Sequence, residues 1–166
     1  MNIALIGFRG TGKTTVAKLL AKKLDKKLVS TDEEIMKKSK TSAAKFVERH
    51  GIDKFREMES EIIENVSDFD DCIFDTGHGM VMRNENIINM KRNAIVVLLT
   101  TDPKAIMGRV GPERLLQAKN DIEIKGMLQE QESRYKKAAD YAIDTSGLSP
   151  EEVCELIVHY VQMELQ

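Results

Sequence analysis

Residues 7–15 read Gly7-Phe8-Arg9-Gly10-Thr11-Gly12-Lys13-Thr14-Thr15 and match the pattern GxxxxGK[ST]. The apolar run Ile3-Ala4-Leu5-Ile6 comes directly before them, and apolar residues at helical spacing follow. A strand, a glycine-rich loop and a helix in this order are typical of a phosphate-binding loop, whose backbone N–H groups surround phosphate oxygens. The sequence therefore predicts a nucleoside triphosphate site.

Each residue type in this loop suits one part of a triphosphate. Lys13 is expected to reach the β- and γ-phosphates, and the Thr14 hydroxyl to hold Mg²⁺. The helix that begins here adds its positive dipole end to the same site. The predicted nucleotide-binding residues of the loop are Gly7, Gly10, Thr11, Gly12, Lys13, Thr14 and Thr15.

The composition limits the classes of protein to consider. With 166 residues, the chain is long enough for one domain (residues 1–166) and too short for two ordinary ones. Its formal net charge of −2 lacks the basic excess of most nucleic-acid binders. Cys72 and Cys154 match no metal or redox spacing, and no signal sequence or membrane span is visible. We expect a cytoplasmic monomer without nucleic-acid or membrane partners.

Strand-like and helix-like segments alternate along the chain. The run Ala94-Ile95-Val96-Val97-Leu98-Leu99 is continuously apolar, as expected for a strand covered on both faces. The alternation predicts an α/β fold: a three-layer sandwich with a five-stranded, mainly parallel sheet flanked by helices. The expected strands are residues 2–6, 27–30, 72–76, 94–100 and 141–144.

Helix starts and two unusual regions complete this outline. Asp102-Pro103 and Ser149-Pro150 each place a capping residue before a first-turn proline, and Ser149 with Glu152 forms a capping box. Residues 31–67 read as helices with no strand between them, which suggests a substrate-binding insertion. Residues 111–120 contain little apolar material and are a candidate lid.

Five further segments allow a comparison with a known family. They are Thr31-Asp32-Glu33-Glu34-Ile35, Phe55-Arg56-Glu57-Met58-Glu59, Thr76-Gly77-His78-Gly79, Gly108-Arg109-Val110 and Glu113-Arg114-Leu115-Leu116. Their order and spacing, over nearly the whole chain, resemble the shikimate kinase family. These are small P-loop kinases related in fold to the nucleoside monophosphate kinases. The resemblance implies ATP and Mg²⁺ as cofactors and a small acceptor molecule as substrate.

The resemblance also implies roles for acceptor-side residues. Asp32 would contact the acceptor hydroxyls and take up a proton as base. Arg56 would grip a carboxylate with the two parallel hydrogen bonds of its planar fork. Backbone N–H groups at Gly77 and Gly79 would approach the substrate.

Two arginines are assigned to the nucleotide side in the same way. Arg109 would stack on adenine. Arg114 would move in with the lid and stabilise charge on the phosphoryl group in transfer. The lid's usual Arg-Pro-Leu-Leu is Arg114-Leu115-Leu116 here, which keeps the charge and loses the proline.

The chain departs from the family at the metal side. In the family, strand two usually ends Asp-x-Asp, and the first aspartate holds Mg²⁺ through water. Ser30 stands at that place here. Asp75 lies at the expected end of strand three, where many P-loop enzymes carry an acidic metal-site residue. We therefore expect Asp75, with Thr14, to serve the metal.

The acceptor side departs as well. The family's triple glycine is Gly77-His78-Gly79, which adds an imidazole to the predicted pocket. The second carboxylate-binding arginine normally precedes a tyrosine by three or four residues. Before Tyr135 those positions hold Gln131 and Glu132, and the nearest arginine is the adjacent Arg134.

Four of these residues also have a structural interpretation. Asp32 is a possible helix N-cap. Arg56 is spaced for a helix-surface salt bridge with Glu59. Arg134 is compatible with a solvated helix face. For His78 a structural and a substrate-binding role are equally open.

The leading hypothesis is a kinase that moves the γ-phosphoryl group of ATP to a hydroxyl of a small anionic metabolite, with shikimate first. Its catalytic residues would be Lys13, Asp32 and Arg114. One alternative is another acceptor, a polyol acid or a nucleoside. The other is a weakly active nucleotide-binding regulator, whereas Thr100-Thr101-Asp102-Pro103 after the fourth strand disfavours a switch GTPase.

Overall fold

The computed structural model describes residues 1–8, 10–102 and 121–166, with the side chains of 121–128 left aside. Within this part, five parallel strands form one sheet in the order β2-β3-β1-β4-β5. The strands are β1 (Asn2–Ile6), β2 (Lys27–Ser30), β3 (Cys72–Asp75), β4 (Ala94–Thr100) and β5 (Tyr141–Asp144). The five expected strands are thus confirmed, and the sheet is wholly parallel in these pairs.

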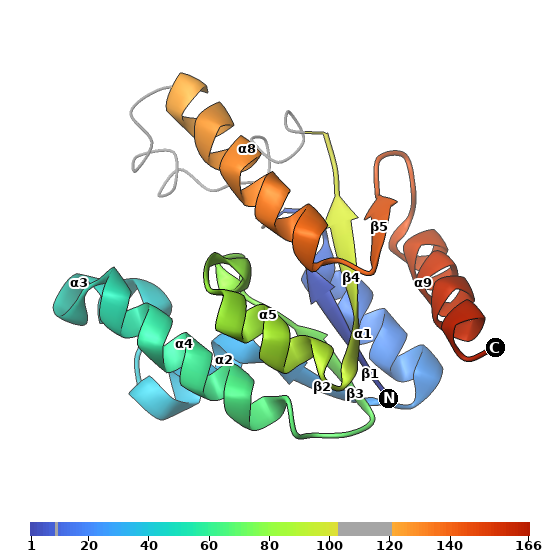
Figure 1. Ribbon diagram of the computed structural model, residues 1–166, viewed down its shortest axis with the longest axis horizontal. Coiled ribbons are helices and arrows are strands. Elements are labelled where there is room, and N and C mark those ends of the chain that lie inside the picture. The colour runs from blue at the N-terminus through green and yellow to red at the C-terminus, as the bar shows by residue number, and fades with distance from the viewer. Residues whose placement is uncertain (9, 103–120) are drawn as a thin grey trace.

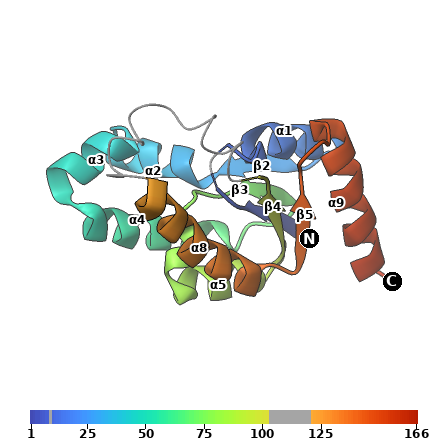
Figure 2. The same ribbon diagram turned by 90° about the horizontal axis from the view of Figure 1, so that it is seen from above.

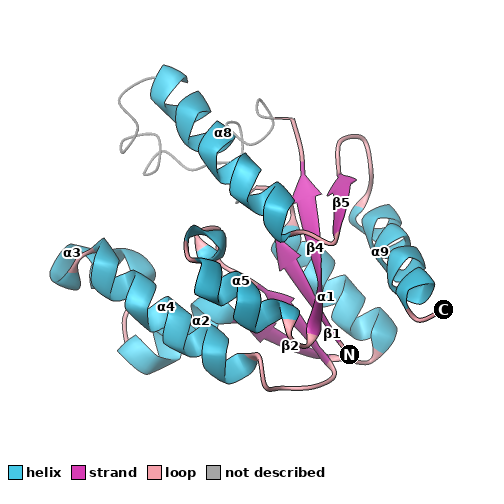
Figure 3. Ribbon diagram, in the orientation of Figure 1, coloured by secondary structure: helices cyan, strands magenta, loops and turns pink. Residues whose placement is uncertain are grey.

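Helices cover both faces of the sheet (Figure 3). One face carries α1 (Lys13–Leu24) and α9 (Pro150–Glu164), packed on Leu5, Val97 and neighbouring apolar residues. The other face carries α4 (Ile52–Val66), the short 3₁₀ helix η1 (Met80–Met82), α5 (Asn84–Lys91) and α8 (Asp121–Ala138), while α2 (Thr31–Ser39) and α3 (Ala43–His50) pack against α4 beside the sheet. Three layers result, as Figure 2 shows from above, and the predicted three-layer α/β fold is confirmed.

Local sequence signals explain several of these boundaries. The capping box expected at Ser149 is present. The Ser149 hydroxyl accepts a hydrogen bond from the Glu152 N–H, and the Glu152 carboxylate accepts one from the Ser149 N–H. Residues 31–67 form α2, α3 and α4, which extend from the sheet on the side opposite to α9 (Figure 1). None of the described helices is both long and apolar enough to span a bilayer.

Register places the carboxyl ends of three strands together. Leu5 of β1 pairs with Asp75 of β3, and Asp75 pairs in turn with Ser30 of β2. In open parallel sheets ligands bind at this edge, where loops leave the strands. The phosphate loop, the start of α2 and the Gly77–Gly79 turn all begin there.

Candidate active site

The loop between β1 and α1 holds the predicted phosphate-binding glycines in a narrow space. Gly7 has φ of 144°, and a Cβ there would lie 2.5 Å from the carbonyl oxygen of Leu99 in β4. A side chain would therefore collide with backbone, so the position requires glycine. Gly10 and Gly12 have φ of 85° and 87°, and Thr15 lies exposed in the first turn of α1.

The lysine of the loop is buried and folded over it. Its ammonium group donates to the carbonyl oxygens of Gly7 at 2.7 Å and Phe8 at 3.1 Å. The Thr11 hydroxyl donates to the same Phe8 carbonyl at 2.8 Å. The charge of Lys13 is thus held where α1 begins, next to the positive end of the helix dipole, and this arrangement favours an anion.

Thr14 and Asp75 meet across the gap between α1 and β3. The Thr14 hydroxyl donates to the Asp75 carboxylate at 2.8 Å. Burial raises the pKa of Asp75, opposed by this hydrogen bond and by the charge of Lys13, while Asp32 and Glu33 raise it further. Asp75 therefore lies close to the lysine of the phosphate loop and to the start of α2.

This pair suits a hard cation. Mg²⁺ prefers oxygen ligands and is commonly held by one or two carboxylates together with substrate phosphates. The Thr14 hydroxyl and the Asp75 carboxylate supply oxygens of that kind beside a phosphate loop. Among the described residues, no group of three or more His, Cys, Asp or Glu side chains is placed so that it could hold a metal ion. The residues present fit Mg²⁺ bound together with a nucleotide.

Ser30, not Asp32, caps helix α2. Its hydroxyl accepts from the Glu33 N–H at 3.2 Å, and α2 begins at Thr31. The interpretation of Asp32 as the N-cap is wrong, because the helix starts directly at the end of β2. Asp32 instead lies in the first helical turn, where its carboxylate is not occupied by the cap.

The Asp32 carboxylate faces the turn after β3. A Cβ at Gly77 would lie 2.7 Å from the Asp32 Oδ1 and 3.2 Å from the Glu59 Oε2. The Gly77 N–H donates to the buried Thr31 hydroxyl at 3.0 Å, which fixes the turn against α2. The missing side chain at position 77 thus lets two carboxylates approach the turn.

Arg56 closes the other side of the same turn. A Cβ at Gly79 would overlap its guanidinium group. Arg56 Nη1 donates to Glu59 Oε1 at 2.9 Å, with 18% of the arginine side chain and 1% of the glutamate side chain exposed. The salt bridge expected between these residues exists, but it is buried rather than on the helix surface. The arginine is held in one orientation over Gly79.

The Glu59 side chain is almost completely buried beneath this arginine. Burial raises its pKa, the Arg56 charge and hydrogen bond lower it, and the Asp32 charge raises it. The balance is a raised pKa, so desolvation outweighs the ion pair. Arg56, Asp32 and Glu59 therefore form one electrostatic cluster around Gly77–Gly79.

Helix α8, which packs against η1, contributes Arg134 and Tyr135 to the surroundings of the turn. The Arg134 Nη1 lies 3.5 Å from the Met82 carbonyl oxygen in η1, and the side chain is half-buried. Arg134 is therefore partly exposed and also contacts the segment that follows the turn. The Tyr135 hydroxyl donates to the carbonyl oxygen of the half-buried His78.

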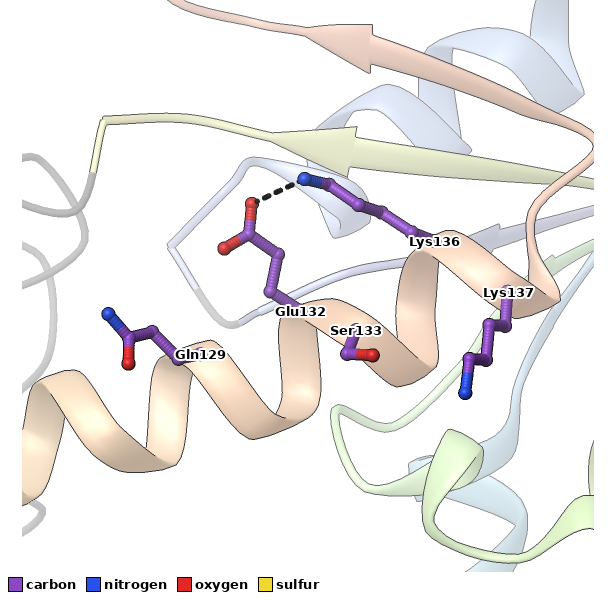
Figure 4. A pocket seen from close by; sticks show the side chains of 5 residues that line it. All are labelled: Gln129, Glu132, Ser133, Lys136 and Lys137. Atoms are coloured by element: carbon purple, nitrogen blue, oxygen red, sulfur yellow. Dashed lines mark ion pairs between the residues drawn. The ribbon is translucent and has the colours of Figure 1, made fainter.

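A second face of α8 lines an open cavity of about 490 Å³ (Figure 4). The Lys136 ammonium lies 3.2 Å from the Glu132 carboxylate there. Glu132, one of the two positions where the resembled family would have an arginine, thus forms an exposed ion pair with a lysine on its own helix. The described lining residues are Gln129, Glu132, Ser133, Lys136 and Lys137.

Comparison with known proteins identifies the family. The family model for shikimate kinase matches residues 9–162. The shikimate kinase of Thermodesulfovibrio yellowstonii is 40% identical over 161 residues, which cover 95% of this chain and 92% of the relative. That of Pelotomaculum thermopropionicum is 35% identical and covers 97% and 95%.

The chain belongs to the shikimate kinase family. Solved structures agree: shikimate kinase from Acinetobacter baumannii in complex with shikimate has a TM-score of 0.91 and 26% identity, covering 98% of this chain and 93% of that one. Shikimate kinase from Aquifex aeolicus has a TM-score of 0.87 and 28% identity, covering 99% and 98%. This family member is an ATP-dependent small-molecule kinase with a hydroxyl acceptor, which confirms that prediction.

The structure brings most of the predicted site of this shikimate kinase family member to one edge of the sheet. Lys13, Thr14 and Asp75 lie together at the phosphate loop, and Asp32 and Arg56 surround the Gly77–Gly79 turn. Arg134 lies beside η1, directly after that turn. Arg109, Arg114, the predicted lid at 111–120 and the helix start at Pro103 lie outside the described residues.

Two buried residues, Glu59 and Tyr135, contact the predicted site without a site role that the sequence predicts. The sequence pattern predicts Glu59 only as a surface salt-bridge partner of Arg56, although Glu59 shares a helical stripe with the apolar Phe55, Ile62 and Ile63, which is a signal of burial. Tyr135 served only as a landmark for the missing arginine. Its contact with His78 joins residues 57 positions apart and leaves no local trace in the sequence.

Proposed function

We propose that this enzyme phosphorylates shikimate, and that Asp32 and Arg56 recognise it. The observation that carries the proposal is the Gly77–Gly79 turn, against which Asp32 and Arg56 pack from two helices. A carboxylate acceptor would meet a guanidinium that Glu59 already orients. Its hydroxyl would meet the Asp32 carboxylate, which accepts the proton as transfer proceeds.

The donor side is proposed to work by positioning and charge stabilisation. Lys13 exchanges the Gly7 and Phe8 carbonyl oxygens for the β- and γ-phosphates. Thr14 and Asp75 would hold Mg²⁺, which when bound neutralises charge on the phosphates. Arg114 and Arg109, the predicted lid and adenine contacts, remain predictions from the family resemblance.

Arg134 is proposed as the second cation for the acceptor carboxylate. Its support is its place beside η1, at the end of the turn that Arg56 covers. His78 is proposed as an acceptor contact from the same turn. The monomeric state, the cytoplasmic location and the absence of nucleic-acid partners stay predictions.

The test is ADP release with shikimate, compared with a panel of polyol acids and nucleosides. We expect turnover that depends on shikimate, is lost in Lys13→Ala and is retained in Lys18→Ala, an exposed lysine on the same helix. Equal ADP release with and without shikimate would reject it as acceptor. Turnover of another panel member would then identify the substrate class.

A further inference from the structure

Tyr135 touches both halves of the active site from within the core. It is 1% exposed and lies on α8, which packs against η1 and β4. Its ring meets Phe8 of the phosphate loop edge-on, with ring centroids 5.0 Å apart and an interplanar angle of 82°. Its hydroxyl donates to the His78 carbonyl in the acceptor-side turn. One side chain thus spans two loops that follow different strands.

The Phe8 end of this contact is sensitive to phosphate. The Phe8 carbonyl accepts from the Lys13 ammonium at 3.1 Å and from the Thr11 hydroxyl at 2.8 Å. A bound phosphate competes for the ammonium, so nucleotide binding alters what holds Phe8. Because the partly buried Phe8 ring packs directly on the buried Tyr135 ring, a shift of Phe8 would change the packing of Tyr135.

The His78 end is sensitive to the position of Tyr135. The carbonyl that accepts the tyrosine hydroxyl lies between Gly77 and Gly79, against which Asp32 and Arg56 pack. Glycines on both sides leave this turn few side-chain contacts of its own. The Thr31 hydroxyl holds the Gly77 N–H of this turn, and the Tyr135 hydroxyl holds the His78 carbonyl one residue later, so Tyr135 restrains the part of the turn between the two glycines.

We propose that Tyr135 is a positioning residue that couples the phosphate loop to the acceptor turn, so that nucleotide binding at Lys13 changes the surroundings of His78. The proposal rests on the proposed function only in that the phosphate loop binds a nucleotide. It does not depend on which acceptor the enzyme uses. A purely structural Tyr135 would fill the core and satisfy the His78 carbonyl without transmitting any change.

The test follows the His78 imidazole by NMR while Mg-ADP is added. The chain has three histidines, so their ring signals are few, and a His78→Gln variant assigns the relevant one. We expect a saturable shift of the His78 signal in the wild type. In Tyr135→Phe, which keeps the ring and removes the hydroxyl, that shift should be at least about threefold smaller.

Two further variants make the result decisive. Tyr141→Phe removes a tyrosine hydroxyl that bonds Glu164 in α9, and it should retain the full shift. Phe8→Leu removes the aromatic ring at the other end of the contact and should reduce the shift as Tyr135→Phe does. If Tyr135→Phe folds poorly, Phe8→Leu provides the test in its place. A wild-type His78 signal that does not shift on addition of Mg-ADP would overturn the proposal. So would a shift in Tyr135→Phe and in Phe8→Leu that is as large as in the wild type. Shikimate is absent from this experiment, so its rejection as acceptor would appear only in the ADP-release assay.

Discussion

Arg56 combines a charged group with a largely buried position. An isolated buried guanidinium would be costly, and Glu59 offsets that cost through the 2.9 Å ion pair. The arginine side chain keeps 18% of its surface exposed. An arginine fixed in this way loses little conformational entropy when a carboxylate arrives.

In Arg56→Lys we expect the KM for shikimate to rise about 10- to 100-fold, because the parallel pair of hydrogen bonds becomes a single one. The effect on kcat should be smaller, since the contact lies away from the transferred phosphoryl group. Steady-state kinetics measure both constants. Arg49→Lys, at an exposed position on α3, is the matched control. An unchanged KM in Arg56→Lys would exclude the proposed carboxylate contact.

Gly79→Ala tests the same contact from the opposite side. The added methyl group would overlap the Arg56 guanidinium, which is the free end of a long side chain. Since φ at Gly79 is −95°, the backbone suits alanine. We expect a shikimate KM raised about tenfold or more, together with a lower unfolding midpoint, because the displaced guanidinium no longer compensates the buried Glu59. Denaturant unfolding and kinetics on one preparation separate the two effects.

Strands β2 and β3 show how an acidic residue beside the phosphate loop can come from either of two neighbouring strands. Ser30 and Asp75 are direct partners in the parallel ladder, so side chains at both positions reach the same edge of the sheet. The resembled family carries its metal-side aspartate on strand two. Here Ser30 caps α2, and Asp75 receives the Thr14 hydroxyl. The two strand ends together still present one acid to the phosphate loop.

This arrangement predicts the outcome of an exchange between the two strands. Asp75→Ser should weaken Mn²⁺ binding to the enzyme with a non-hydrolysable ATP analogue about 10- to 100-fold. Adding Ser30→Asp should recover part of the loss, and aspartate also caps helices well. Titration of Mn²⁺ by EPR reports binding without turnover. Equal Mn²⁺ affinity in the wild type and Asp75→Ser would contradict a metal role for Asp75.

The elements themselves were largely predictable because their signals are local. The apolar run of β4 and the Ser149–Glu152 capping box are read directly from neighbouring residues. The cap of α2 was misplaced, because Ser30, Thr31 and Asp32 are all good caps and only the end of β2 selects among them. Contacts such as Thr14 with Asp75 depend on sheet register, which the sequence does not state.

Across the whole molecule, apolar residues fill the core, and charged residues with little exposure gather at the candidate site. The two apolar clusters cover opposite faces of the sheet, whereas Glu59, Lys13 and Asp75 gather at its carboxyl edge. Burial raises the pKa of both Glu59 and Asp75. Ionised carboxylates at these places reduce the stability of the fold, and this produces a dependence on pH.

For Glu59 the direction follows from its raised pKa. A carboxyl group whose pKa is raised on folding contributes stability that is fully present below its unfolded value, 4.5, and is lost as the pH rises through the folded pKa. Glu59→Gln cannot ionise and lacks this loss. We therefore expect the free energy of unfolding of Glu59→Gln, relative to wild type, to rise as the pH increases from about 4 to 7.

Urea unfolding at several pH values measures this difference. Glu61→Gln on the same helix is the control, because its hydrogen bond to Lys38 lowers the pKa of the exposed Glu61. Its difference from wild type should be small, with the opposite direction of change. A Glu59→Gln difference that falls with rising pH would contradict the raised pKa.

The buried pair of Arg56 and Glu59 also bears on how such an enzyme changes its substrate over evolutionary time. Losing either partner alone would leave an uncompensated charge in the interior, at a cost of about 3–5 kcal/mol. Even where the carboxylate contact is no longer needed, replacing Arg56 and Glu59 one after the other would therefore pass through an intermediate with a less stable fold. Acceptor specificity at this turn is consequently expected to change by paired replacement, or to be retained.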